Sequence, residues 1–195
     1  LKVEDPTALN RASAAVQKLI EKAPIPPEIE KAVFAAYDKL GKDPYVAVRS
    51  SATAEDLPEA SFAGQQETYL NIQGDSSLIL HVRKAWASLF EPRAIYYREN
   101  QGFDHFSVSL AVPVQRMVQS DVAGIMFTIN PVTNDKGNIV IEAIWGLGER
   151  IVQGTITPDH HEVDRQSWNI TNTETIDQKV EMVKKHGRTF DAKVP

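Results

Sequence analysis

The sequence contains no cysteine among its 195 residues. That absence excludes a disulfide framework, a zinc–thiolate site and a catalytic thiol. Long apolar runs are missing as well, since no stretch approaches the roughly 20 residues that span a bilayer. We therefore expect no membrane span, and a cytoplasmic location fits both absences.

An excess of basic residues is also absent. The net charge is -5, with 26 acidic against 21 basic residues, which argues against a general nucleic-acid binder. Hydrophobic residues make up 42% and charged residues 24%, as is typical of a soluble globular protein. The chain starts at Leu1 without a signal-peptide pattern, so we expect a piece of a longer chain that forms one domain or two small lobes.

Helical patterns dominate the first hundred residues. Asp5-Pro6 predicts a helix N-terminus, and a second helix is expected from Pro27 to Gly41. Further helices are expected over 78–89 and from residue 92 to about 100. The apolar residues expected on the inward face of the first helix are Leu9, Val16, Leu19 and Ile20. Short strands are expected at 45–48 and 67–72, with a loop over 50–66 between them.

Strand patterns follow Gly102. Alternation over 108–114 predicts a half-buried strand, and the apolar segments 122–129 and 139–144 flank a turn, which predicts a hairpin. A second hairpin is expected from 161–164 and 168–173. The tail is expected to be extended over 179–194 with a turn at 186–188, and a helix over 176–185 is the alternative. Helices followed by mostly antiparallel strands indicate an α+β fold, with the helices packed on one side of a sheet.

Arg49 closes the first expected strand and is followed by two serines and a threonine. An arginine held at a strand end suits bidentate phosphate recognition, and hydroxyl and backbone N–H groups could complete an anion site. The alternative is an arginine paired with Glu55 or Asp56 beside a serine-rich turn. The residues alone favour that alternative.

Small residues surround Gly64 a little further along. They let a backbone approach a ligand closely. No Gly-Lys-Ser/Thr follows, so the segment is not a P-loop. A glycine-bearing hairpin over phosphates is one option, and an ordinary surface turn is the alternative.

Together, these two segments resemble a known family. The run from Val46 to Leu70 is similar to the ATP-binding domain shared by phosphoenolpyruvate synthases, pyruvate phosphate dikinases, rifampicin phosphotransferases and glucan water dikinases. Further similar segments, in chain order, are Trp86-Ala87-Ser88-Leu89-Phe90, Val114-Gln115-Arg116-Met117-Val118, Gly124-Ile125-Met126-Phe127-Thr128, the run 141–149 with its Gly146-Leu147-Gly148-Glu149, and Thr157-Pro158-Asp159. The resemblance runs from about residue 45 to residue 164.

The resemblance implies an ATP-grasp-like fold, in which two lobes close on ATP. Residues 1–195 would be a partial nucleotide-binding domain, with a helix-rich part carrying the phosphate loop at about 1–100 and a strand-rich part carrying the adenine hinge at about 101–195. By position, Arg49 would contact the ATP phosphates as the catalytic residue. Gly64 and Thr68 would cover those phosphates.

The adenine end of the implied site falls in the strand-rich part. Gln115 would sit at the adenine edge, where its amide offers both a donor and an acceptor. Met117 and Val118 would supply the hinge backbone and an apolar wall. For Gln115 the alternative is a glutamine that faces water, and for Met117 it is a place in the core.

Mg²⁺ is the metal expected to accompany ATP. Glu142 and Glu149 are the candidate carboxylates, because Mg²⁺ favours oxygen ligands, and an ion pair with Arg150 or another base is the alternative. His160 and His161 are adjacent in an expected strand, so they point to opposite faces and chelate poorly. We expect both histidines to face solvent, and Trp86 and Trp145 to lie in the core.

Three parts of the family's machinery have no counterpart in these residues. They are an upstream lysine, a later set of glutamate, glutamine and arginine, and a Gly-Gly-x-Thr-Ser-His segment that carries the phosphohistidine. We therefore expect part of a dikinase of the phosphoenolpyruvate synthase type, which splits ATP and passes a phosphoryl group to a histidine on another domain, for transfer to pyruvate. Residues 1–195 alone should bind ATP weakly at most and show little or no activity.

Other functions stay open at this point. The chain could be the ATP domain of a rifampicin phosphotransferase, a non-catalytic nucleotide-binding module, or a plain structural domain. The expected partners are ATP, a swivelling phosphohistidine domain and an acceptor-substrate domain. Nucleic acid and membranes are not among them.

Overall fold

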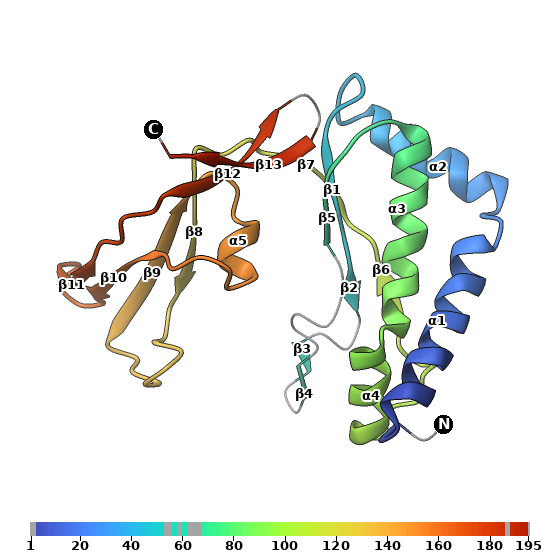
Figure 1. The fold of residues 1–195 in the computed structure, drawn as a ribbon, viewed down its shortest axis with the longest axis horizontal. Helices are drawn as coiled ribbons and strands as arrows, with labels where there is room; N and C mark the ends of the chain where they lie inside the picture. Colours follow the sequence, from blue (N-terminus) through green and yellow to red (C-terminus); the bar gives the residue numbers. More distant parts are fainter. Residues whose placement is uncertain (1–2, 53–55, 58–59, 62–67, 186–187, 195) are drawn as a thin grey trace. The chain divides into compact units, whose positions relative to one another are not determined.

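The structure is a computed structural model that describes residues 3–52, 56–57, 60–61, 68–185 and 188–194. The chain divides into two compact units, residues 1–117 and 118–195. Each unit is treated by itself, and Figure 1 labels their helices and strands. Every strand pair is antiparallel, apart from an isolated parallel bridge between Gly146 and Met182. The expected α+β class is confirmed.

The first unit holds the long helices. Its elements are α1 (Pro6–Lys22), α2 (Pro27–Asp38), β1 (Val46–Arg49), β2 (Ser51–Ala52), β3 (Asp56–Leu57), β4 (Ala60–Ser61), β5 (Thr68–Ile72), α3 (Asp75–Ala87), the short 3-10 helix η1 (Ser88–Phe90), α4 (Pro92–Gln101), β6 (Leu110–Ala111) and β7 (Val114–Arg116). The main sheet has the order β5-β1-β7. Figure 1 shows α3 lying between this sheet and α1, so α3 is the helix that covers the sheet.

The core of the first unit forms where α3 meets β1. Val46 and Val48 point to this side and are fully buried, and they pack with Leu78 and Val82 of α3. Alternation along β1 therefore sends Ala47 and Arg49 to the opposite face. The helix side of the sheet therefore holds the core of this unit, and the opposite face carries Ala47, which is covered, and Arg49, which is exposed.

Helix α1 begins as the sequence predicts. The Asp5 carboxylate accepts hydrogen bonds from the backbone N–H groups of Thr7 and Ala8, at 2.9 and 3.2 Å, which satisfies two donors at the helix start. The expected inward face is partly wrong, because Leu19 is 72% exposed. The buried residues are Leu9 and Ser13, and the Ser13 hydroxyl donates to the Phe90 carbonyl at 2.7 Å. Helix α1 is thus rotated so that a polar residue faces inward.

The expected strand over 108–114 is broken in the structure. Strand β6 pairs with β2, whereas β7 pairs with β1. Pro113 lies between them and has no N–H group to continue a ladder. Its carbonyl accepts a hydrogen bond from the Arg49 backbone N–H at 3.0 Å, so the chain changes partner strand at the proline.

The second unit is built from hairpins. Its elements are β8 (Val122–Phe127), β9 (Asn138–Trp145), α5 (Glu149–Val152), β10 (Asp159–Asp164), β11 (Ile170–Glu174), β12 (Val180–Lys185) and β13 (Arg188–Lys193). The sheet order is β11-β10-β9-β8, with β12 and β13 as a separate pair. Both expected hairpins and the extended tail are confirmed. The alternative helix over 176–185 is wrong.

Trp145 corrects a second expectation about the core. Its side chain is 44% exposed, at the C-terminal end of β9. Trp86 is half-buried against the core of the first unit. Among the described residues, no helix is both long and apolar enough to cross a bilayer.

Candidate functional site

The exposed face of the β5-β1-β7 sheet brings three predicted site residues together. Arg49 lies directly opposite Thr68 on β5, and Ala47, two residues before Arg49, lies opposite Gln115 on β7. Directly opposed residues of antiparallel strands point to the same side, as do residues two apart. Arg49, Thr68 and Gln115 therefore share one face, and all three are exposed.

A hydrogen bond joins two members of this group. One terminal N–H of the Arg49 guanidinium donates to the amide oxygen of Gln115, at 3.4 Å. The bond is long and solvent-exposed, so it is weak. A guanidinium carries five N–H donors in a planar fork, and this bond uses one of the Arg49 donors.

The backbone holds Arg49 firmly even though its side chain is exposed. Arg49 is the last residue of β1, and its own N–H is bonded to Pro113 on the neighbouring segment. Val48, the preceding residue, is fully buried. The guanidinium is thus an exposed group on a fixed backbone position, which suits the capture of a charged ligand.

Ala47 also lies on the candidate face, opposite Gln115, and sequence reasoning did not single it out. It lies between Arg49 and Gln115 on the shared face, and its methyl group is small and covered, at 6% exposure. The signal in the sequence was its position two residues before Arg49, which places both on one side of a strand.

Met117 and Val118 follow the site strand. The Met117 backbone N–H donates to the Tyr45 carbonyl at 2.8 Å, so this group is used inside the sheet. The Met117 side chain is half-buried. Val118 is the first residue of the second unit and is 76% exposed.

Two expectations cannot be compared with the structure. Gly64 and Glu55 lie outside the described residues, as does the side chain of Asp56. The predicted phosphate-covering loop and the alternative ion pair of Arg49 with Glu55 or Asp56 both stay predictions.

The candidate metal carboxylates lie in the second unit and already have partners. An oxygen of Glu142 lies 3.7 Å from Nδ1 of His160, and the other ring nitrogen lies 3.5 Å from Glu162. Glu149 accepts a hydrogen bond from the Gln153 amide at 3.0 Å. Arg150 pairs with Asp191 instead of either glutamate.

The two adjacent histidines are less exposed than expected. His160 contacts Glu142 and Glu162, and one ring nitrogen of His161 lies 3.2 Å from the Thr173 hydroxyl. Both side chains are half-buried, so the expectation that they face solvent is wrong. Cross-strand neighbours on β9, β10 and β11 cover them.

No group of three or more histidine, aspartate or glutamate residues in the described part of the chain is arranged to hold a metal ion. Glu142 faces an imidazole, and Glu149 is bonded to an amide. These residues therefore do not fit a Mg²⁺ site among themselves, and no chemistry is assigned to a metal here.

One pocket of about 360 Å³ lies in the second unit, and none of the candidate residues above lines it, although Arg150, next to Glu149, does. Two segments that flank the β10–β11 hairpin line it, together with Arg150. Its two basic residues are already paired, Arg150 with Asp191 and Lys179 with Asp177. The pocket therefore offers no unpaired charge from these side chains, and we assign it no role.

Comparison with known proteins identifies the class of this domain. The family model described as "Pyruvate phosphate dikinase, AMP/ATP-binding domain" matches residues 1–195. The chain belongs to this family, as its motifs suggest.

Individual relatives narrow the class further. The chain is 49% identical over 201 residues to a probable phosphoenolpyruvate synthase of Methanocaldococcus jannaschii, which covers 100% of this chain and 17% of the relative. It is 46% identical over 200 residues to a probable phosphoenolpyruvate synthase of Methanothermobacter thermautotrophicus, covering 100% of this chain and 29% of the relative. A phosphoenolpyruvate synthase of Pyrococcus furiosus is 50% identical over 173 residues, which are 86% of this chain and 21% of the relative. The chain thus spans less than a third of each of these proteins.

Proposed function

We propose that this chain is the ATP-binding part of a dikinase of the phosphoenolpyruvate synthase type. The observation that carries the proposal is the exposed sheet face on which Arg49, Thr68 and Gln115 lie together. An arginine fork, a hydroxyl and an amide on one face are suited to an extended, charged ligand with polar edges. Family membership and the names of the relatives support ATP as that ligand.

In the proposed complex, Arg49 binds the phosphate chain of ATP and neutralises part of its charge. Thr68, directly opposite, adds a hydroxyl, and the loop that includes Gly64 covers the phosphates. Gln115 exchanges its bond with Arg49 for contacts to the nucleotide at the adenine edge, next to Met117 and Val118. The fold that would close over ATP is of the ATP-grasp type.

The proposed reaction needs more than these residues. ATP is split, and a phosphoryl group passes to a histidine on another domain of the longer protein and then to pyruvate. Positioning and charge neutralisation dominate such transfers, and Arg49 supplies one part of each. We propose that residues 1–195 alone bind ATP weakly and do not turn it over.

The experiment compares Arg49→Ala with Arg116→Ala in the full-length protein, with ATP affinity measured by titration calorimetry. Arg116 is an exposed arginine on the same sheet, but it lies opposite Val46 and so on the other face. A hydrogen bond to a charged group contributes about 1.5–3 kcal/mol, so Arg49→Ala should weaken ATP binding by about 10- to 150-fold. Arg116→Ala should stay within about twofold of the natural protein.

Equal losses of ATP affinity in the two variants would contradict the proposed site, because the losses would then come from removing a positive charge and not from the position of Arg49. A second measurement follows acid-labile phosphate on the protein after incubation with labelled ATP. Arg49→Ala should lower this labelling even at saturating ATP. If Arg49→Ala leaves phosphate labelling unchanged at saturating ATP, Arg49 contributes to ATP binding but not to phosphoryl transfer.

A further inference from the structure

Strand β5 carries one residue more than β1 over the stretch where the two strands pair. Val46 lies opposite Ile72, and Val48 lies opposite Tyr69, with a shift of register between these two pairs. One residue of β1 therefore faces two residues of β5. An extra residue in one strand of an antiparallel pair is a β-bulge, and bulges are common beside functional sites, where they re-aim a side chain.

Asn71 is one of the two residues in the bulge, and its φ angle is +57°. This left-handed conformation is uncommon for a residue that has a side chain, and asparagine is among the residue types that adopt it most readily. The other described residues with side chains in this conformation, Asp43, Asn134 and Trp168, lie outside the strands. Asn71 is thus a left-handed residue inside a strand.

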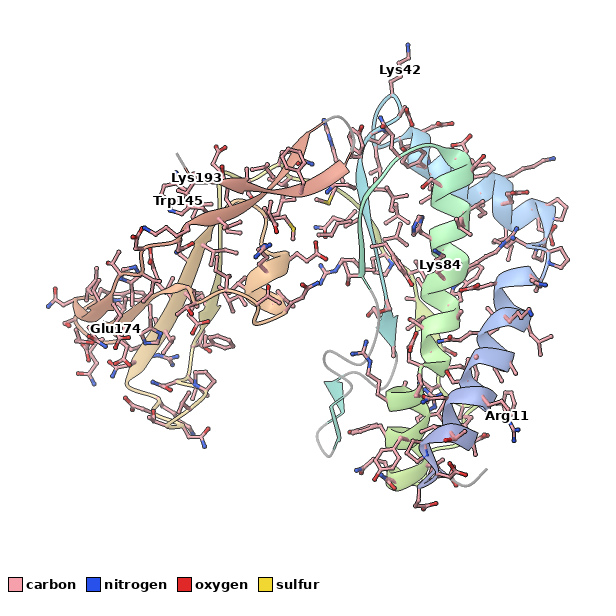
Figure 2. All side chains as sticks on the ribbon, in the orientation of Figure 1. Arg11, Lys42, Lys84, Trp145, Glu174 and Lys193 are labelled. Atoms are coloured by element: carbon pink, nitrogen blue, oxygen red, sulfur yellow. The ribbon has the colours of Figure 1, made fainter. Side chains whose placement is uncertain are left out.

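The bulge changes which side chains of β5 face the core. Ile72 and Tyr69 both pack with the core of the first unit, although residues three apart in a regular strand point to opposite faces. Helix α3, which contacts β1 and β5, defines this core side, and Figure 2 shows it beside the two strands with Lys84 labelled. The extra residue therefore allows two residues at an odd spacing to share one face.

The bulge also decides the direction of Thr68. With the bulge, Thr68 lies opposite Arg49 on the face of the candidate site. A regular ladder continued from Ile72 would place Leu70 opposite Val48 and Thr68 opposite Ser50. A one-residue change of register sends each side chain to the other face, so Thr68 would turn to the core side and away from Arg49.

Burial of apolar side chains does not by itself choose between these two registers. The bulged register places Tyr69 opposite Val48, and the straight register would place Leu70 there. Both side chains are large and largely apolar, and Ile72 keeps its place in either case. The conformational preference of residue 71 is therefore the feature that separates the two arrangements.

We propose that Asn71 is a positioning residue of the candidate site. Its left-handed backbone stabilises the bulged register, and that register places the Thr68 hydroxyl beside Arg49. Asn71 acts through Thr68. The consequence for ATP binding rests on the proposed function, whereas the register is a property of the fold and can be measured without nucleotide.

The first experiment reads the register with disulfides in the full-length protein. Arg49→Cys with Thr68→Cys reports the bulged register, and Ser50→Cys with Thr68→Cys reports the straight one. Directly opposed residues of antiparallel strands lie within the distance that a disulfide spans. Residues 1–195 contain no cysteine, so peptide mass spectrometry can identify each bridge. The measured quantity is the ratio of the 49–68 yield to the 50–68 yield under the same oxidation.

Three changes at position 71 test the proposal. Asn71→Gly keeps the left-handed conformation accessible and should leave the ratio within about twofold. Asn71→Val penalises it and should lower the ratio by about 5- to 30-fold. Deletion of Asn71 removes the extra residue, so Thr68 stays opposite Arg49 and the 49–68 bridge should still form. An unchanged ratio in Asn71→Val, or loss of the 49–68 bridge in the deletion, would overturn the proposal.

The second experiment measures ATP affinity by titration calorimetry in a double-mutant cycle. Asn71→Val should weaken ATP binding about as much as Thr68→Val does. In the Thr68→Val protein, Asn71→Val should change ATP affinity by less than about twofold, because the hydroxyl that it positions is already absent. Equal losses with and without Thr68 would refute action through Thr68. Natural ATP affinity in Thr68→Val would instead contradict the proposed ATP site, and the disulfide ratio would still report on Asn71.

Discussion

Gly146 provides a quantitative test of how the two sheets of the second unit are joined. Its φ angle is +77°, and a Cβ placed on it would lie 2.4 Å from the Met182 carbonyl oxygen and 3.0 Å from the Met182 nitrogen. The next residue, Leu147, donates its N–H to the same Met182 carbonyl at 2.9 Å. The Gly146→Ala change therefore forces β12 away from the end of β9.

Gly154 serves as a control, because a side chain there meets the same backbone penalty as at Gly146 but no steric clash. Its φ angle is +64°, and a Cβ placed on it meets nothing within 4 Å. Gly154→Ala carries only the left-handed backbone penalty of about 1–2 kcal/mol. Gly146→Ala carries the same penalty, plus about 1–3 kcal/mol of overpacking and about 1 kcal/mol for the lost hydrogen bond. The expected loss is about 1–2 kcal/mol for Gly154→Ala and about 3–6 kcal/mol for Gly146→Ala.

Urea unfolding followed by circular dichroism measures both losses, and hydrogen exchange of the amides of residues 180–185 locates the effect. Exchange in β12 should accelerate in Gly146→Ala and stay unchanged in Gly154→Ala. Equal losses of stability with unchanged β12 exchange would refute the reasoning. So would a Gly146→Ala protein of natural stability that has lost ATP binding, since the glycine would then serve the ligand rather than the junction.

Two further predictions concern single side chains of the second unit. The Ser167 hydroxyl and the backbone N–H groups of Ser167 and Gln166 donate to the Asp164 carboxylate, which lowers the pKa of Asp164 below its ordinary value. The Asp164 carboxylate therefore stabilises the folded state at pH values above its unfolded pKa of about 3.9. This stabilisation is lost as the pH falls through the pKa of Asp164 in the folded state. NMR titration of Asp164 should show the lowered midpoint, and a midpoint at or above about 3.9 would contradict the prediction. The buried Gln178 side-chain amide accepts a hydrogen bond from the backbone N–H of Trp145 and donates one to the Ala143 carbonyl, both at 3.1 Å. Gln178→Leu should therefore lower the free energy of unfolding in urea by about 2 kcal/mol. The control, exposed Gln166→Leu, should lower it by less than about 0.5 kcal/mol.

The elements that the sequence predicts well are those with a local pattern. The Asp5 cap, the helices that begin at prolines and the two hairpins depend on neighbouring residues, and each is confirmed. The break at Pro113 was also encoded locally, but the alternating valines concealed it. The helical spacing of the apolar residues could not show that Leu19 faces outward. The packing of α1 against α3 and α4 decides which residues of α1 face inward.

Buried polar groups are harder to predict than apolar ones. Arg98 is fully buried in α4, where its Nε donates to His105 at 3.1 Å, and burial lowers the pKa of its guanidinium. Its place in the sequence, next to charged and polar residues, indicates a solvated helix face. Tertiary contacts decide such cases, and a single sequence does not record them.

For the candidate site, the resemblance named the residues, and that assignment stays a prediction, while their arrangement could not be read from the sequence. Arg49, Thr68 and Gln115 come from three segments, and strand register alone brings them to one face. Register depends on the pairing of β1 with both neighbours, which no local pattern specifies. The cross-strand contact of Glu142 with His160 was hidden for the same reason.

The hydrogen bond between Arg49 and Gln115 restricts which residue can stand at position 115. A glutamate has nearly the same shape, but it would turn a weak bond between an ion and an amide into an ion pair. The guanidinium would then be held by its neighbour and would have to break that pair before meeting any other anion. A neutral amide can keep the arginine oriented and still release it. The chemistry of the partner residue thus sets how readily Arg49 can exchange one contact for another.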